Sequence, residues 1–337
     1  MSDLHVVSGK GGTGKTTVAA ALAISLAQGG RRTLVVEVEG RQGIAQLFDT
    51  PPLPYEERPV AVAPDGGEVR ALAIDPQEAL LDYLESFYNL RRAGAALRKM
   101  GAIDFATTIA PGLRDVLLTG KAVEVVRRKD KKDRHEKSGK GDKPTETWYD
   151  AVVIDAPPTG RIAQFLNVNS EVSGLAKVGP IRNHADLVMN VIASPRTAVH
   201  LVTLLEEMPV QETLDAVDEL REVGLSLGSI IVNMARPPRL AEAYLEQALA
   251  GTLAELERTG IERSLAACGL AEHAGTISTA LLDEAADHAQ RVALESRERT
   301  RLVELGLPMA TLPFLPGGID LGSLYELAGV LSEAGLR

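Results

Sequence analysis

The chain has 337 residues, which is enough for one large α/β domain or two ordinary ones. Its net charge of −10 argues against a general nucleic-acid-binding protein, and it contains no run of about 20 apolar residues that could span a membrane. The single cysteine, Cys268, excludes an intrachain disulfide and leaves too few ligands for a cysteine-based metal site. We expect Cys268 to be a small buried thiol. The N-terminus carries no signal-peptide pattern, so we expect a cytoplasmic protein.

The N-terminal third alternates between strands and helices. Residues 4–8 form an apolar strand, a glycine-rich loop follows, and residues 15–28 form a helix that ends at Gly29-Gly30. Residues 32–39 form a second strand, rich in β-branched side chains. This order is a βαβ unit, and it predicts an α/β fold with a mostly parallel central sheet and helices on both faces.

The middle of the chain is predicted to add helices to this sheet. Residues 51–65 are rich in proline and glycine, which indicates a surface connection, and a strand is expected at 69–75. Residues 76–126 and 160–195 are expected to be helical additions. Residues 127–147 carry nine Lys or Arg against five Asp or Glu, with almost nothing apolar, which predicts a disordered basic insertion. The alternative is a contact for an acidic partner or for lipid head groups at a membrane surface.

The remaining elements continue the same sheet. Strands are expected at 149–155, 198–205, 229–233 and 309–312, and helices at 209–223, 240–259, 278–304 and 321–334. No internal repeat is visible.

The segment from Gly9 to Thr16 matches the whole phosphate-binding pattern G-x-x-x-x-G-K-[ST]. Its glycines let backbone N–H groups surround phosphate oxygens, Lys15 can reach the β- and γ-phosphates, and the Thr16 hydroxyl is placed as a Mg²⁺ ligand. The strand before the loop and the helix after it are the context that this site needs. Residues 1–337 are therefore predicted to be one P-loop ATPase domain that binds ATP and Mg²⁺. The residues expected to bind nucleotide in the loop are Gly9, Gly11, Gly12, Thr13, Gly14, Lys15, Thr16 and Thr17.

A second lysine, Lys10, gives the loop the form Lys-Gly-Gly-Thr-Gly-Lys-Thr. This form resembles the deviant, signature-lysine loop of SIMIBI-type P-loop proteins. They include septum-site and chromosome-partitioning ATPases, nitrogenase iron proteins, and the arsenical-pump and tail-anchored-protein-targeting ATPases. The resemblance implies that Lys10 reaches across a dimer interface to the partner's phosphates and stabilises charge on the transferring phosphoryl group. The alternative is an ordinary exposed lysine.

Two strands end in carboxylates that are candidates for the chemistry. Glu37 and Glu39 alternate across the pleat of strand 32–39, so we expect only one of them to face the phosphates. By resemblance, Glu39 orients the attacking water; the alternative is a structural cap or ion pair. Asp155 ends an apolar strand in the Walker B arrangement, and it is expected to hold Mg²⁺ through water.

Later motifs narrow the resemblance to the arsenical-pump and tail-anchored-targeting family. The run Ala156-Pro157-Pro158-Thr159-Gly160-Arg161 resembles that family's Asp-Thr-Ala-Pro-Thr-Gly-His-Thr switch, with Gly160 offering a backbone N–H to the γ-phosphate. By the same resemblance, Glu212 contacts nucleotide and Asn233 reads the adenine edge. Pro313 and Phe314 flank the base, or form a plain turn.

The resemblance implies a dimeric ATP switch, with itself or with a related ATPase, that couples Mg-ATP-driven closure to a protein client. The single cysteine argues against arsenite activation and against a zinc-clamped dimer. Residues 188–192 could line a client groove, and we favour the core for them. Glu39 and the altered switch leave open a slow or inactive ATP-binding scaffold subunit of a heterodimer. A small-molecule ligase or kinase with the same loop type is the other alternative.

Overall fold

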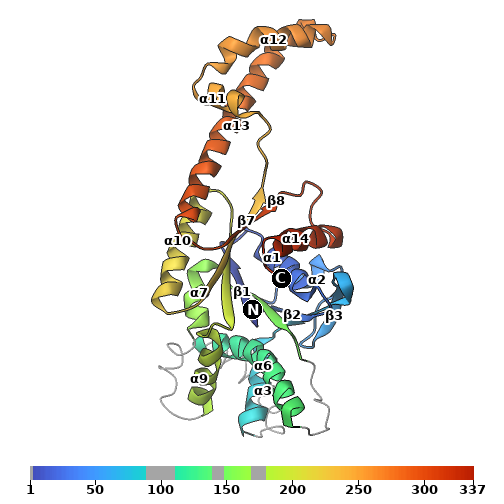
Figure 1. The fold of residues 1–337 in the computed structure, drawn as a ribbon, viewed down its shortest axis with the longest axis vertical. Helices are drawn as coiled ribbons and strands as arrows, with labels where there is room; N and C mark the ends of the chain where they lie inside the picture. The colour runs from blue at the N-terminus through green and yellow to red at the C-terminus, as the bar shows by residue number, and fades with distance from the viewer. Residues whose placement is uncertain (1–2, 89–110, 139–147, 168–179) are drawn as a thin grey trace.

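A computed structural model describes residues 3–88, 111–138, 148–167 and 180–337 (Figure 1). Its described strands form one eight-stranded sheet in the order β3-β4-β2-β5-β1-β6-β7-β8. Every pair of neighbours is parallel except β3 with β4. The predicted mostly parallel sheet is thus confirmed. The strands are β1 (Leu4–Gly9), β2 (Arg32–Glu37), β3 (Arg58–Val62), β4 (Glu68–Ala73), β5 (Ala151–Asp155), β6 (Thr197–Thr203), β7 (Leu227–Ala235) and β8 (Met309–Pro313).

Helices cover both faces of this sheet, as predicted. Helices α1 and α14 pack together on one face, while α6, α7, α9 and α10 lie on the other. The helices are α1 (Lys15–Ala27), α2 (Gly43–Leu47), α3 (Pro76–Tyr88), α6 (Pro111–Ser138), α7 (Thr159–Leu166), α9 (Pro180–Ile192), α10 (Glu207–Glu222), α11 (Glu242–Leu249), α12 (Leu253–Ala267), α13 (Ala274–Val303) and α14 (Leu321–Glu333), with short 3-10 turns at η1 (Pro64–Gly66) and η2 (Ala271–His273).

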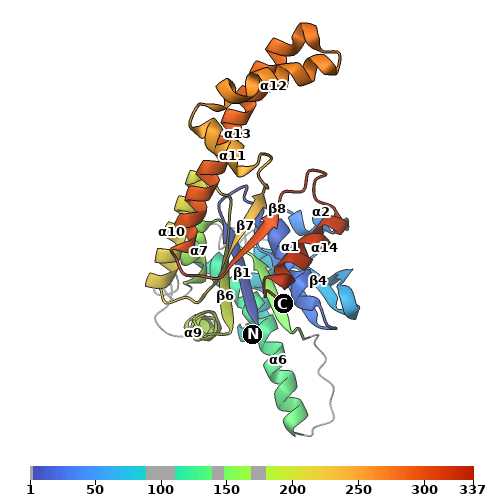
Figure 2. The same cartoon turned by 45° about the horizontal axis from the view of Figure 1, so that its top comes forward.

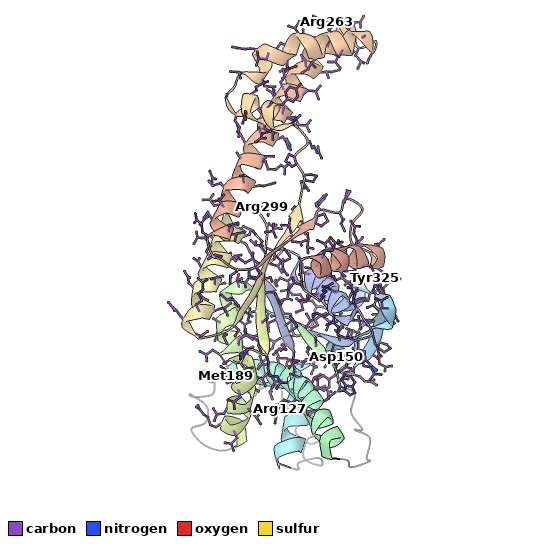
Figure 3. The ribbon with its side chains drawn as sticks, in the orientation of Figure 1. Arg127, Asp150, Met189, Arg263, Arg299 and Tyr325 are labelled. Carbon is purple, nitrogen blue, oxygen red and sulfur yellow. The ribbon has the colours of Figure 1, made fainter. Side chains whose placement is uncertain are left out.

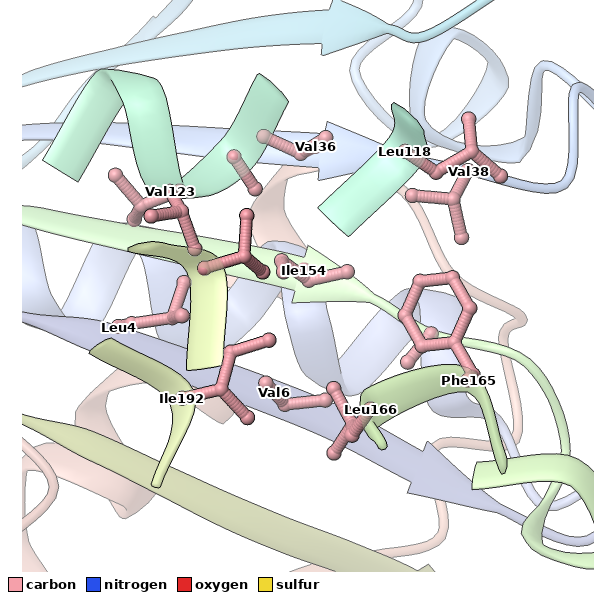
Figure 4. Close-up of a cluster of buried hydrophobic side chains, with 14 of the residues drawn as sticks. Leu4, Val6, Val36, Val38, Leu118, Val123, Ile154, Phe165, Leu166 and Ile192 are labelled. Atoms are coloured by element: carbon pink, nitrogen blue, oxygen red, sulfur yellow. The ribbon is translucent and has the colours of Figure 1, made fainter. Parts of the chain in front are cut away.

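The period-two alternation of the strands divides the core between the two faces. Leu4 and Val6 of β1 pack with α6, α7 and α9, whereas Val7 packs with α1 and α14. Figure 4 shows the first cluster, in which Ile154 of β5 lies among side chains from β1, β2 and three helices. Because the central strands are buried on both faces, the residues at their carboxyl ends are held in fixed positions.

Three helices leave the body of the molecule and form an arm (α11, α12 and α13). The arm follows β7 at the carboxyl edge of the sheet, and it projects away from the strands in both views (Figures 1 and 2). It has a small core of its own that includes Leu245, Leu253 and Leu282. Figure 3 shows Arg263 at its outer end and Arg299 near its base, where the Arg299 guanidinium donates to the Thr311 hydroxyl of β8 at 3.1 Å.

The basic insertion is not irregular over its first half, which corrects the sequence-based prediction. Helix α6 continues through it to Ser138, while residues 139–147 lie outside the described part of the chain. Lys, Arg and Glu are good helix formers, and a charged segment can extend a helix that is already anchored by its apolar end. Glu124 and Arg128 pair at 3.4 Å across one turn near the start of this segment.

Other predictions also need correction. Residues 58–62, expected to be a surface connection, form the edge strand β3, where Pro59 is tolerated because an edge strand has one side free of ladder bonds. The helix expected at 240–259 is divided by Gly251, which has a positive φ of 75°, into α11 and α12. Cys268 is exposed, not buried, because it ends α12 on the arm.

The predicted helical additions are described only in part. Residues 89–110 and 168–179, within the additions at 76–126 and 160–195, lie outside the described residues. In the described part of the second addition, Val188, Val191 and Ile192 are buried in the core, so the core interpretation of residues 188–192 is confirmed for these three. None of the helices described in the structure is both long and apolar enough to cross a membrane.

Candidate nucleotide site

The glycine-rich loop connects β1 to α1 at the centre of the sheet. Gly9 lies so close to β6 that a Cβ would collide with the carbonyl oxygen of Val202. Gly14 has a φ of 87°, and a Cβ there would meet the side chain of Asn233. The loop is also closed on itself, because the Thr13 hydroxyl donates to the carbonyl of Lys10 at 2.9 Å. Gly9 and Gly14 therefore fit where larger residues would not.

A hollow of about 230 Å³ opens over this loop. It is bounded by the carboxyl ends of β2 and β5 and by the start of α1, as expected for a ligand site in a parallel sheet. Its lining residues are Gly12, Gly14, Lys15, Thr16, Glu37, Glu39, Arg41, Gly43 and Asp155. The structure thus brings together Lys15, Thr16, Glu39 and Asp155, four of the residues that the sequence predicted for catalysis and metal binding.

Thr16 and Asp155 fit the expected Mg²⁺ site. The Thr16 hydroxyl donates to Oδ2 of Asp155 at 2.7 Å, although the two residues are 139 positions apart. The other oxygen of Asp155, Oδ1, is buried and has no hydrogen-bond partner among the described residues. A hydroxyl beside a carboxylate with one unused oxygen is a donor set that suits a hard cation. When bound there, Mg²⁺ would neutralise charge on the phosphates.

Burial shifts the pKa values of Asp155 and Lys15. It raises the pKa of Asp155 to about 6, against the opposing effects of the Thr16 hydrogen bond and of Lys15; Glu37 and Glu39 raise it further. Burial also lowers the pKa of Lys15 from its usual value, while Asp155 and Glu39 act in the opposite direction. A cation and a triphosphate entering the hollow would therefore replace water around charges that are already poorly solvated.

Lys10 lies outside the hollow and is already paired within its own chain. Its Nζ lies 2.8 Å from Oε1 of Glu212, and both side chains are partly exposed. The other oxygen of Glu212 accepts a hydrogen bond from the Thr159 hydroxyl at 3.2 Å. Lys10 of the phosphate loop, Thr159 of the switch run and Glu212 of α10 thus form one connected group.

Glu37 and Glu39 both line the hollow, which corrects the expectation that only one of them could face the phosphates. Side chains two residues apart lie on the same side of a strand, so the pleat does not separate Glu37 from Glu39, and β2 itself ends at Glu37. Glu37 is 2% exposed, and its carboxylate accepts the backbone N–H groups of Gln42 at 2.5 Å and Ile44 at 3.1 Å. Glu39, beyond the strand, forms only a long contact with Arg41, at 3.7 Å.

The predicted base-binding residues gather at the ends of β7 and β8. Asn233 is buried, and its amide donates to the carbonyl of Thr13 at 2.9 Å. Phe314 follows β8, and the Arg236 guanidinium stacks over its ring at 4.0 Å. Pro313 ends β8 beside them. The end of β7 also carries Met234 at a positive φ of 54°, within a shift of the register with β8, and Ala235 then pairs with Pro313.

Two other predicted residues lie at the margin. Gly160 is the exposed second residue of α7, and Thr17 is half-buried in the first turn of α1; neither lines the hollow. Arg161, which follows Gly160, pairs with the buried Asp115 of α6 at 3.3 Å. The role predicted for Gly160 therefore depends on how the switch run moves when nucleotide binds.

Glu37 should be the structural member of the carboxylate pair. Replacing Glu37 with Ala is expected to lower the free energy of unfolding by about 2 kcal/mol, because one buried and one partly buried N–H group lose a charged acceptor while repulsion with Asp155 is relieved. Glu39→Ala, the matched control two residues away, should change it by less than about 0.5 kcal/mol. Urea unfolding measures both, and equal effects would contradict this assignment.

Comparison with known proteins identifies the family of this chain. The sequence profile of a family described as Anion-transporting ATPase matches residues 3–195. The chain belongs to this family. Its members are ATPases, so the chain is an ATP-hydrolysing protein of the α/β P-loop type. Family membership also favours the ATPases over the small-molecule ligase or kinase that the loop alone would allow.

Individual members of the anion-transporting ATPase family match over most of this chain. ATPase BagA of Mycobacterium tuberculosis is 51% identical over 338 residues, covering 99% of this chain and 94% of that protein. An arsenical pump-driving ATPase of Acidiphilium multivorum is 27% identical over 335 residues, covering 95% of this chain but 53% of the pump ATPase. A pump ATPase of Escherichia coli is 26% identical, and 42% of it is covered. The chain spans about half of these two pump ATPases.

Proposed function

We propose that this ATPase works as a dimeric switch, in which Mg-ATP closes two subunits across Lys10 and hydrolysis releases them. The observation that carries the proposal is the pairing of Lys10 with Glu212 in the single chain. A lysine held beside the loop by a partly exposed carboxylate can be withdrawn at little cost, since such pairs contribute about 1 kcal/mol or less. Lys10 is then free to reach phosphates bound to another subunit.

The surface around the nucleotide site supports a dimer face at this edge. Large apolar side chains are exposed at the end of β7, in the segment between β8 and α14, and in the first turns of α10 and α14, and we call this set the apolar rim. A partner that covers the apolar rim would bury these side chains and exclude water from the phosphates. The partner is a second copy or a related ATPase. The rim residues are Met208, Met234, Phe314, Ile319 and Leu321.

The arm offers a route from this switch to a protein client. Gln211, next to Glu212 on α10, accepts a hydrogen bond at 2.5 Å from Arg301 of α13. Movement of Glu212 when Lys10 leaves would therefore act on the base of the arm. The arm also exposes the large apolar side chains of Leu249, Leu256 and Leu281, which a client could cover. We infer that the client binds there.

Two inactive variants test the dimer. Lys10→Ala is expected to bind ATP, to stay monomeric with ATP, and to lose at least 10-fold in turnover. Lys15→Ala should also be inactive. Mixing the two should restore part of the turnover, because one site in a mixed dimer has both its own Lys15 and the partner's Lys10. Lys121→Ala, which removes a lysine ion-paired with Asp82 at 3.0 Å outside the hollow, is the control and should turn over normally.

Oligomer size, measured with and without nucleotide, and the rate of ATP turnover together distinguish the dimeric switch from the scaffold subunit. A Lys10→Ala monomer that hydrolyses ATP at the wild-type rate would show that Lys10 does not act in trans. A wild type that binds ATP without turnover would instead support the scaffold alternative, in which a related active ATPase completes the dimer.

A further inference from the structure

Arg41 is a cation at the phosphate site that neither the P-loop pattern nor the dimer proposal uses. It lines the hollow together with Lys15, Thr16 and Asp155. The hollow holds three carboxylates, from Glu37, Glu39 and Asp155, and only two cationic side chains, from Lys15 and Arg41. A triphosphate entering this space needs positive charge around it, and Arg41 is the second source among the residues that line the hollow.

The backbone on both sides of Arg41 is anchored. Glu37, before it, accepts the N–H groups of Gln42 and Ile44, so the loop is tied back onto the end of β2. The Gln42 side chain bonds both backbone groups of Leu53, accepting from N at 2.7 Å and donating to O at 3.2 Å. The turn itself uses Gly40 at a φ of 69°. The Cα of Arg41 is therefore held at the mouth of the hollow.

The guanidinium of Arg41, in contrast, is only loosely held. Its side chain is 76% exposed, and its contact with Glu39 is long, with 3.7 Å between Nε and Oε2. An exposed ion pair of this kind contributes little and exchanges readily for a stronger anion. Its charge also reaches the phosphate loop, because Arg41 contributes to the lowered pKa of Lys15. A fixed backbone with a mobile cation at its end suits a group that moves when substrate binds.

We propose that Arg41 is a catalytic residue for ATP hydrolysis, whose guanidinium leaves Glu39 and binds a γ-phosphate oxygen in its own subunit. The water oxygen forms a bond to the γ-phosphorus while the bond from phosphorus to the β–γ bridging oxygen breaks, and ADP keeps that electron pair. The water proton passes to the Glu39 carboxylate, which the departure of Arg41 has freed, and then to solvent. Arg41 donates hydrogen bonds to the charge that develops, and it forms no covalent bond.

The test separates transition-state stabilisation from simple binding. Arg41→Ala should lower kcat by about 10²-fold and leave the KM for ATP nearly unchanged. Added guanidinium ion should restore part of the turnover of Arg41→Ala and should not stimulate the wild type. Arg239→Ala removes an arginine that pairs with Glu284 at 3.9 Å on the arm side of the molecule, and this control should keep wild-type kinetics. Because Arg41 is exposed, the urea midpoint of the Arg41 variants should match that of the wild type.

A second measurement does not depend on turnover. ADP with aluminium fluoride, which mimics the transferring phosphoryl group, should bind Arg41→Ala about 10²-fold more weakly than the wild type, while ADP alone binds both equally. Wild-type kcat in folded Arg41→Ala, or a rise in KM alone, would overturn the proposal. Arg41 acts within its own subunit, so wild-type kinetics in Arg41→Ala would leave the Lys10 dimer untouched. Binding of the fluoride complex to Arg41→Ala can likewise be measured even if Lys10 does not act across a dimer.

Discussion

Asp155→Asn is expected to lose about 10³-fold in Mg²⁺-dependent ATP turnover and, at the same time, to make the nucleotide-free protein more stable at pH 7.5. The first effect follows because Asn keeps the size of the side chain but removes the negatively charged oxygen that suits Mg²⁺. A bound Mg²⁺ stabilises the charge of the transition state by several kcal/mol. The second follows from burial of the charge. Ionised Asp155 thus supports ATP turnover but lowers the stability of the nucleotide-free protein.

The sign of the stability change follows from the pKa of Asp155. The folded state raises it from 3.8 to about 6, so between these values the folded protein binds more protons than the unfolded chain. The contribution of Asp155 to stability is therefore complete below pH 4 and is lost as the pH rises through 6. A shift of this size corresponds to about 3 kcal/mol, which Asn, being neutral, does not lose. The gain from Asp155→Asn should accordingly be absent at pH 4, grow as the pH rises, and be complete above pH 6.

Asp150→Asn is the matched control, because Asp150 lies just before the other end of β5 (Figure 3) and accepts the backbone N–H of Arg32 at 2.9 Å. It should keep wild-type turnover. Thermal unfolding with and without Mg-ATP checks the coupling: the ligand should stabilise the wild type and Asp150→Asn, and have little effect on Asp155→Asn. An Asp155→Asn protein that turns over ATP at the wild-type rate would remove Asp155 from the metal site.

The local parts of the nucleotide site could be predicted from the sequence. The phosphate loop is a continuous segment between a strand and a helix, and Asp155 ends an apolar strand that a parallel sheet places beside it. These features depend on neighbours in sequence and on one topological rule. The alternation of strands and helices along the chain predicted the sheet, the helices on both of its faces and a site at the strand ends.

The contacts that connect distant segments could not be predicted. The pairing of Lys10 with Glu212, and that of Glu212 with Thr159, depends on the angle at which α10 meets the loop, which no local pattern encodes. The use of Glu37 as an anchor was missed because the strand was expected to continue to Glu39. The only sequence signal for the anchor is a turn-forming Gly40 between an acidic strand end and a short helix.

Arg41 was missed for a different reason. A resemblance assigns roles only to positions that match the family's motifs, and Arg41 lies in none of the motifs that carry the resemblance here. Its place at the hollow became visible only when the anchors of this loop were known. An arginine outside every motif can therefore still add positive charge to the site that it borders.

Acid should destabilise this protein through a buried histidine pair. His200 of β6 is 2% exposed, and its ring stacks on that of His5 of β1 with centroids 5.3 Å apart. Its Nδ1 accepts the N–H of Ser229 at 3.1 Å, so the neutral ring carries its proton on Nε2 and donates it to Nδ1 of His5, also at 3.1 Å. Gly228 leaves room for the ring, since a Cβ there would collide with it. A second proton on His200 has no acceptor in this arrangement.

The pH range of this destabilisation follows from the pKa of His200. Burial, followed by the neighbouring His5, lowers the pKa of His200 from 6.5 to about 3 in the folded state. Below pH 6.5 the unfolded chain therefore binds a proton that the folded protein excludes, so stability is present above this pH and is lost as the pH falls towards 3. The loss from His200 alone should be about 2 kcal/mol at pH 5.

His200→Asn tests this directly, because the Asn side-chain oxygen can accept from Ser229 but does not titrate. The variant should be about 1–2 kcal/mol less stable than the wild type at pH 7.5, since the shorter side chain leaves a cavity. Between pH 7 and pH 5, the decrease in its free energy of unfolding should be about 2 kcal/mol smaller than the decrease for the wild type, as measured by urea unfolding. His273→Asn, at the exposed turn between α12 and α13, should keep the wild-type slope. If His200→Asn keeps it as well, the acid sensitivity arises elsewhere in the fold.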